Sequence, residues 1–186
     1  MKLTRILSVF VLALVIAACG GESSDQQAAQ ETETTEQART IEIIGLNSLK
    51  FAVEENVDGI TVGEQVGTNN ELLRLETITA QPGEEITIEL TTQSQLPASA
   101  MAHNWLLLAM DADVTAFAQA AAQAKENDYV PADQTDQIIA QTGLAGGGET
   151  TSVTFTVPSE PGEYEYICTF PGHFQANMRG TLVVKG

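Results

Sequence analysis

The sequence predicts an all-β sandwich of about eight strands, with a helical flap inserted between two of them. Three observations support this fold: short runs of alternating apolar and polar residues, Gly and Pro turns between the runs, and one Ala- and Gln-rich stretch without alternation. Alternation puts every second side chain on one face of a strand, as in a half-buried sheet. Of the 186 residues, 43% are hydrophobic and 18% charged, which is typical of a globular protein.

The first residues are predicted to direct export and not to fold. Lys2 and Arg5 precede the apolar run Ile6 to Ala18, which is short for a membrane span. The end of this run is similar to a bacterial lipoprotein signal, so residues 1–18 are predicted to be a signal peptide and Cys19 to carry the lipid. The alternative is an ordinary secretory signal. The lipoprotein interpretation places the protein on the outer, periplasmic face of the cell membrane.

Residues 19–40 are predicted to be an acidic, disordered tether. From residue 20 to residue 40 there is no aromatic residue and no Ile, Leu or Val, so this segment cannot bury enough apolar surface to offset its chain entropy. The remaining residues, 41–186, are enough for one domain with one core.

The strands are predicted wherever the alternation is clear. The segment from Thr151 to Val157 alternates without a fault and places Val153, Phe155 and Val157 on one face. The run Ile86, Ile88, Leu90 follows the turn pair Pro82-Gly83. The other predicted strands are Ile41 to Leu46, Leu72 to Ile78, Asn104 to Met110, Tyr164 to Cys168 and Thr181 to Lys185, with weaker ones at Phe51 to Val53 and Gly59 to Val62.

The stretch from Asp111 to Thr142 is predicted to be a helical flap that covers one flank of the sandwich. Val114, Phe117, Ala121 and Ala124 recur at helical spacing, and Asp111 or Asp113 is a suitable N-cap. A second short helix is predicted over Asp133 to Gln141. A merely solvated insertion is less consistent with Phe117 and the pair Ile138-Ile139.

The scarce metal-binding residues indicate the chemistry. The domain contains one Cys and two His: Cys168 ends a predicted strand, His173 follows in the next loop, and His103 starts a strand about 65 residues earlier. Met178 lies five residues after His173. A thiolate, two imidazoles and a thioether suit copper in both oxidation states, as a trigonal His₂Cys plane with a weak axial Met. A single mononuclear copper site is therefore predicted.

Each of these residues also has an ordinary interpretation. A lone buried Cys is usually a small apolar residue, a His is usually a hydrogen-bonded polar group, and a Met usually fills core space. The combination favours a metal, because both His and the one Cys of the domain fall at strand ends or in one loop. The low counts of Cys and His exclude zinc ribbons, iron–sulfur clusters and disulfide frameworks.

The segments Met101 to Trp105 and Cys168 to His173, with the flap between them, resemble azurin-type cupredoxins, and among these the auracyanins, blue copper proteins of filamentous anoxygenic phototrophs. The resemblance covers about residues 41–186. It implies an eight-stranded Greek-key sandwich with a type 1 copper held by His103, Cys168, His173 and Met178.

Three features differ from common azurins. The interval between His173 and Met178 has four intervening residues where azurins have three, a longer form that auracyanins share. Ala102 stands where azurins commonly have a Gly whose carbonyl lies near copper, which puts such a contact in doubt. The usual azurin disulfide is missing, since Cys168 has no partner in the domain.

The resemblance also implies supporting residues. Asn104 would tie the two ligand segments together, and Thr169, directly after the thiolate, would join it in tuning the site. The alternative for Asn104 is an ordinary strand-edge amide. A patch of apolar residues near the ligand loops would receive redox partners. Its predicted members are Leu96, Met101, Pro171 and Phe174.

The charge balance bears on the partners. The chain carries 25 acidic and 8 basic residues, which argues against a nucleic-acid binder and favours a basic partner such as a cytochrome face. The predicted function is a monomeric single-electron carrier cycling between Cu(I) and Cu(II), not an enzyme. It would serve membrane complexes of a photosynthetic chain, such as a quinol-oxidising complex or a reaction centre.

The alternative function is an exported copper chaperone or storage protein, although such proteins favour Met- and His-rich exposed sites and this chain has only four Met. A multicopper oxidase or a copper nitrite reductase would need further His ligands that the chain lacks. A Cys–His hydrolase would need a base and an orienting residue in a cleft, which nothing in the sequence suggests.

Overall fold

The computed structural model describes residues 38–186, so the predicted signal peptide, Cys19 and nearly all of the predicted tether lie outside the described residues. Within this part, no helix is long and apolar enough to cross a membrane. The strands are β1 (Arg39–Leu46), β2 (Phe51–Val53), β3 (Ile60–Val66), β4 (Leu72–Ala80), β5 (Glu85–Gln93), β6 (Ala102–His103), β7 (Leu106–Leu108), β8 (Ile138–Gln141), β9 (Ala145–Gly146), β10 (Thr150–Thr156), β11 (Gly162–Ile167) and β12 (Arg179–Val184).

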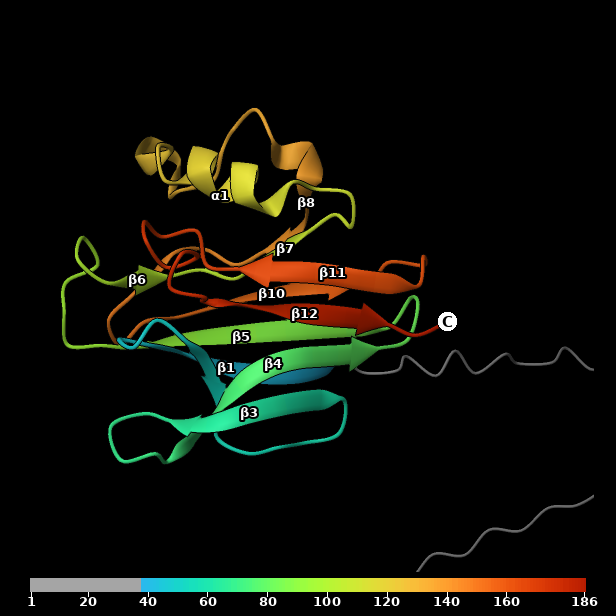
Figure 1. Cartoon of the computed structure of the whole chain (residues 1–186), viewed down its shortest axis with the longest axis horizontal. Helices are drawn as coiled ribbons and strands as arrows, with labels where there is room; N and C mark the ends of the chain where they lie inside the picture. The colour runs from blue at the N-terminus through green and yellow to red at the C-terminus, as the bar shows by residue number, and fades with distance from the viewer. Residues whose placement is uncertain (1–37) are drawn as a thin grey trace, which may run out of the picture. The chain divides into compact units, whose positions relative to one another are not determined.

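The strands form a curved sandwich of mixed pairing (Figure 1). Ten strands share one hydrogen-bonded sheet in the order β10-β5-β1-β2-β4-β12-β11-β7-β8, with β3 paired to β4, and β6 pairs with β9 separately. The pairs β1–β5 and β4–β12 are parallel, although most others are antiparallel. Parallel pairs join strands that are distant in sequence, so the connections cross between layers as in a Greek key. The predicted all-β sandwich with a flap is confirmed, and the additional strands are short.

Alternating residues build the core, as the sequence pattern requires. Ile86, Ile88 and Leu90 of β5 are fully buried, while Glu85 and Glu89 between them are exposed. Arg39 and Thr40, which the sequence analysis placed in the tether, belong to β1 and pair with Ile86 and Thr87. The domain therefore starts at least two residues earlier than the predicted boundary.

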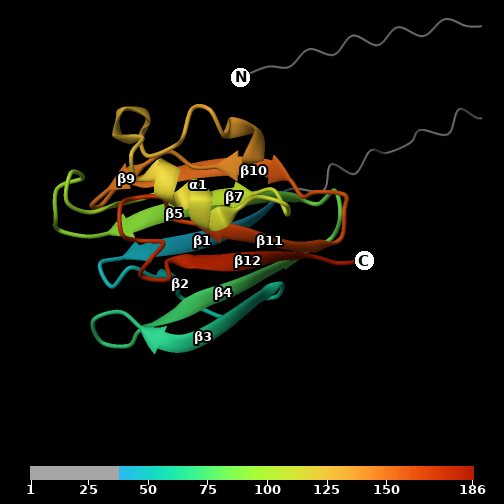
Figure 2. The ribbon, with the colours of Figure 1, turned by 45° about the horizontal axis from the view of Figure 1, so that its top comes forward.

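The predicted flap lies on one side of the sandwich, and its first helix is confirmed. α1 (Val114–Ala121) begins after Asp113, whose side chain accepts a hydrogen bond from the Ala116 backbone N–H. Figure 2 shows α1 lying across β7 and β11. Phe117 and Ala121 are buried in a cluster with residues of those strands. The flap is therefore packed and is not a solvated insertion.

The second predicted helix is wrong. Only one short 3₁₀ turn forms there, at Thr135–Gln137, and the following residues Ile138–Gln141 form strand β8, which pairs with β7. The β-branched pair Ile138-Ile139 fits a pleated strand, and the open edge of β7 supplies hydrogen-bonding partners that a local pattern does not reveal.

The single strand predicted over Asn104 to Met110 is also corrected. The structure ends β6 at His103 and starts β7 at Leu106. In between, the backbone N–H of Trp105 bonds the Thr142 hydroxyl and not a neighbouring strand. His103 is thus the last residue of a two-residue strand, a short and firmly held support for a side chain.

Candidate metal centre

Two segments that are far apart in sequence place the candidate donors together. His103 ends β6, and Cys168 follows the last residue of β11. His173 lies in the loop between β11 and β12. β7 follows the His103 segment and pairs with the end of β11, with Leu106 opposite Ile167. This pairing brings the two ligand segments side by side.

The three predicted donors converge on one point. The donor atoms of His103, Cys168 and His173 all lie within 4.8 Å of one another, and all three residues are buried. The Cys168 Sγ is 3.4 Å from Nδ1 of His173 and 3.8 Å from Nδ1 of His103. Both imidazoles therefore turn the same ring nitrogen toward the sulfur, as a shared metal ion requires.

Met178 is held next to this group by the backbone. Its N–H donates to the His173 carbonyl at 3.0 Å, and its own carbonyl accepts from the Cys168 N–H at 3.1 Å. The side chain is fully buried. These two bonds close the ligand loop on itself, so the fourth predicted donor lies in the same buried loop as Cys168 and His173.

Burial sets the protonation of the donors. It lowers the pKa of His103 to about 3, with His173 adding to the effect, and it lowers the pKa of His173 to about 4. Burial raises the pKa of the Cys168 thiol to about 12, although the backbone N–H groups of Asn104 and Phe170 act in the opposite direction. At neutral pH the site therefore offers two neutral imidazoles and one thiol that still carries a proton.

These donors fit copper. Two borderline nitrogens, a thiolate sulfur and a nearby thioether form the ligand set that soft and borderline metals prefer, and no carboxylate belongs to the cluster. His103 Nε2 is buried without a hydrogen-bond partner among the described residues. Its Nδ1 is the ring nitrogen that faces the sulfur, which leaves that atom free to coordinate.

Asn104 links the two ligand segments. Its side-chain amide donates to the Thr169 hydroxyl at 2.7 Å, and its carbonyl oxygen accepts from the Thr169 backbone N–H at 2.9 Å. Both residues are buried. The bonds join the residue after His103 to the residue after Cys168, so Asn104 is more than a strand-edge amide.

We expect Asn104→Ala to lower the free energy of unfolding of the metal-free protein by about 2 to 4 kcal/mol, because it leaves two buried Thr169 groups unpaired. Denaturant titration measures this effect. Thr169→Ser is the matched control: it keeps the backbone N–H and the hydroxyl, so we expect a loss of no more than about 1 kcal/mol. Equal losses in the two variants would show that the link does not depend on the hydrogen bonds.

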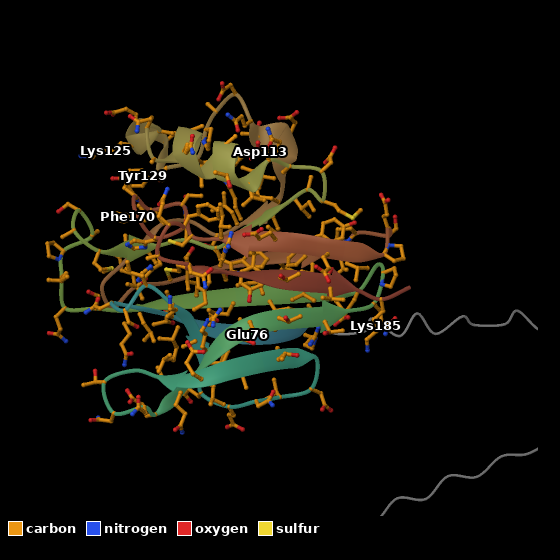
Figure 3. The ribbon with its side chains drawn as sticks, viewed as in Figure 1. Glu76, Asp113, Lys125, Tyr129, Phe170 and Lys185 are labelled. Atoms are coloured by element: carbon orange, nitrogen blue, oxygen red, sulfur yellow. The ribbon has the colours of Figure 1, made fainter. Side chains whose placement is uncertain are left out.

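Sequence reasoning missed an aromatic support for His173. The Phe170 ring lies 4.8 Å from the His173 ring, and Tyr129 of the flap lies 5.1 Å from Phe170 on its other side, between ring centroids. Figure 3 shows Tyr129 and Phe170 together at the flap side of the domain. Tyr129 has a left-handed backbone, with φ of 61°, and no local sequence pattern predicted its contact with the ligand loop.

Gly45 is the second residue that sequence reasoning missed. A Cβ atom at this position of β1 would lie 2.6 Å from Cδ2 of His103, so only a glycine allows the imidazole to rest against the strand. An isolated Gly inside an apolar strand often marks such a close approach. This signal was present in the sequence.

The predicted apolar patch is partly accessible. Leu96 is 46% exposed and Pro171 is also exposed, whereas Met101 and Phe174 are half-buried. The Arg179 guanidinium stacks over the Phe174 ring at 5.1 Å. Of the two histidines, His173 has the larger exposure, at 3% against 0% for His103. That these residues form one docking surface remains a prediction.

Comparison with known proteins identifies similar chains. Residues 60–185 match the family model of copper binding proteins of the plastocyanin/azurin family. The chain is 43% identical over 105 residues to azurin iso-2 of Methylomonas sp. strain J, covering 54% of this chain and 78% of that protein. It is 47% identical over 83 residues to auracyanin-B of Chloroflexus aurantiacus, covering 44% of this chain but only 35% of that protein.

Solved structures agree with these matches. The structure of auracyanin A, a blue copper protein from Chloroflexus aurantiacus, superposes with a TM-score of 0.58 at 34% identity, covering 78% of this chain and 98% of that one. Dithionite-reduced auracyanin from Roseiflexus castenholzii superposes with a TM-score of 0.59 at 28% identity, covering 80% and 98%.

Proposed function

The chain belongs to the plastocyanin/azurin family of blue copper electron carriers, and we propose that it carries single electrons between membrane redox complexes of a photosynthetic chain. The observation that supports this best is the convergence of His103, Cys168 and His173 within 4.8 Å in a fully buried cluster. Both solved relatives described above come from photosynthetic bacteria. This origin favours the same setting for the present chain.

The protein's own residues fix the geometry of the site. When bound, copper supplies the one-electron chemistry by cycling between Cu(I) and Cu(II). His103 is fixed by β6 and Gly45, and His173 by Phe170 and the closed ligand loop. Donors held on rigid supports move little when the charge of the site changes, so little energy is lost to rearrangement. Burial also keeps water away from the thiolate.

We also propose a location and a route for the electrons. The lipoprotein-like signal would anchor the mature chain through Cys19 on the outer face of the membrane, and the tether would let the domain reach neighbouring complexes. Electrons would enter and leave near His173, the more exposed of the two histidines, beside Leu96, Met101, Pro171 and Phe174. The partners would be a cytochrome, a quinol-oxidising complex or a reaction centre.

A redox titration of the purified, copper-loaded full chain tests the proposal. We expect one copper per chain, an intense blue absorption in the oxidised state, and reversible one-electron bleaching with the metal retained over repeated cycles. A colourless Cu(II) adduct, several copper ions per chain, or release of the metal on reduction would instead indicate a storage or chaperone function. Metal analysis and spectroelectrochemistry provide the measurements.

The protonation of the donors predicts how copper affinity depends on pH. Because the pKa values of His103 and His173 lie at about 3 and 4, both rings are neutral above pH 5 and release no proton on binding. The Cys168 thiol, with its pKa of about 12, must lose one proton. We therefore expect the apparent Cu(II) association constant to rise about tenfold per pH unit from pH 6 to 9. Chelator competition measures it, and a slope of zero or two protons would contradict the assignment.

A further inference from the structure

A groove lies outside the copper site, on the outer face of β1. It has a volume of about 480 Å³, with Ile44, Val57 and Ile60 among its apolar lining residues. Val57 is 51% exposed, and it is one of only three large apolar side chains that are strongly exposed in the described part of the chain. The groove therefore leaves apolar surface open to water, which is typical of a binding site.

Four glutamates line the same groove. None of them forms an ion pair among the described residues, whereas Glu64, Glu76, Glu84 and Glu165 elsewhere do. No Lys or Arg lines the groove. Two of the four, on β1 and β5, stand directly opposite each other in the strand register, where like charges repel. The four residues, called here the acidic rim, are Glu42, Glu54, Glu55 and Glu89.

The groove connects directly with the metal site. Ile44 lines it and is followed by Gly45, the residue against which His103 packs. Because successive side chains of a strand point to opposite faces, Ile44 faces outward while the Gly45 position faces His103. A partner in the groove would thus lie behind His103, separated from it by the thickness of one strand.

The charges decide what fits. The predicted tether carries five acidic residues and one Arg, and the domain from residue 41 carries 20 acidic and 5 basic residues. Both the tether and a second copy of this chain would therefore add negative charge to a groove that already has four unpaired carboxylates. A partner with exposed Lys or Arg around an apolar side chain would instead complement both the rim and the floor.

We propose that this groove is a docking site for a cationic partner protein, which places basic side chains against the acidic rim and an apolar side chain against Ile44, Val57 and Ile60. The inference rests on the proposed electron-carrier function and adds a second contact surface to it, on the His103 side of the site. The partner reaches the copper ligand through Ile44 and Gly45. The net negative charge steers the approach, and the groove fixes where the partner settles.

The experiment compares two variants of equal net charge, each with four acidic residues neutralised. The probe is a lysine-rich c-type cytochrome, added to the reduced, copper-loaded full chain with labelled Ile and Val methyl groups. The rim variant carries Glu42→Gln, Glu54→Gln, Glu55→Gln and Glu89→Gln. The control carries Glu126→Gln, Asp133→Asn, Asp136→Asn and Glu163→Gln, all of them exposed residues outside the groove.

We expect the probe to shift the methyl signals of Ile44, Val57 and Ile60 in the unmodified chain. At low ionic strength, the association rate constant should fall at least about tenfold in the rim variant and less than about threefold in the control. Equal falls in both variants, or no methyl shifts in the groove, would overturn the proposal. Both variants should keep the blue absorption and normal reduction by ascorbate, and loss of either in the unmodified chain would count against the electron-carrier function itself.

Discussion

Replacing Cys168 with Ser is expected to abolish the intense blue absorption of the copper-loaded protein and to weaken Cu(II) binding by at least about a hundredfold. The blue band comes from charge transfer between a thiolate and Cu(II), and a hydroxyl is a harder donor that cannot supply it. Cys168 is the one free cysteine among the described residues. Visible spectroscopy and chelator competition measure the two effects.

Two further substitutions serve as controls for this prediction. Cys19→Ser removes the only other thiol of the chain, which lies in the signal region, and we expect it to leave the spectrum unchanged. Met178→Leu keeps an apolar side chain of similar volume in the core, so we expect the blue band to persist with a changed reduction potential. A blue band in the Cys168→Ser protein would contradict the ligand assignment.

Gly45→Ala is expected to weaken copper binding by about ten- to a hundredfold, although Gly45 offers no donor side chain. The added Cβ would lie 2.6 Å from Cδ2 and 2.8 Å from Cγ of His103, so the ring must move away from the sulfur that it faces. Overpacking of this kind also lowers the free energy of unfolding, by about 1 to 3 kcal/mol. Copper competition and denaturant titration separate the two effects.

Gly83→Ala is the matched glycine control. A Cβ there would meet nothing within 4 Å, but the φ of +77° makes an alanine unfavourable by about 1 to 2 kcal/mol. We therefore expect a comparable loss of stability with unchanged copper affinity. If Gly45→Ala also kept the wild-type affinity, the contact with β1 would not be what positions His103.

The predicted fold was correct where alternation and packing agree. β5 and β10 carry a clear period of two, and the structure pairs them with Val153 opposite Ile88 and Phe155 opposite Ile86. The Ile138-Ile139 segment failed because its local context suits a short helix, whereas the edge of β7 offers backbone partners. That choice depends on a strand about thirty residues earlier in the sequence.

The sequence identified the donors for a similar reason. A metal needs particular atoms, and this domain has one thiol and two imidazoles to give, so the candidate ligands follow from counting. The same reasoning singled out Asn104 and Thr169, which the structure joins by hydrogen bonds. It missed Phe170, Tyr129 and Gly45, because ring packing and backbone approach are common in any core and carry no chemical signature.

The sequence by itself thus determined the fold class, the donor set and the kind of metal, since these depend on periodicity and on which atoms the chain possesses. The tertiary structure decided how the donors are held: Gly45 against His103, Phe170 against His173, and the loop bonds that bring Met178 beside them. It also placed the four glutamates of the acidic rim around one groove. Such contacts depend on strand register and on the folding back of distant segments, which local sequence patterns do not encode.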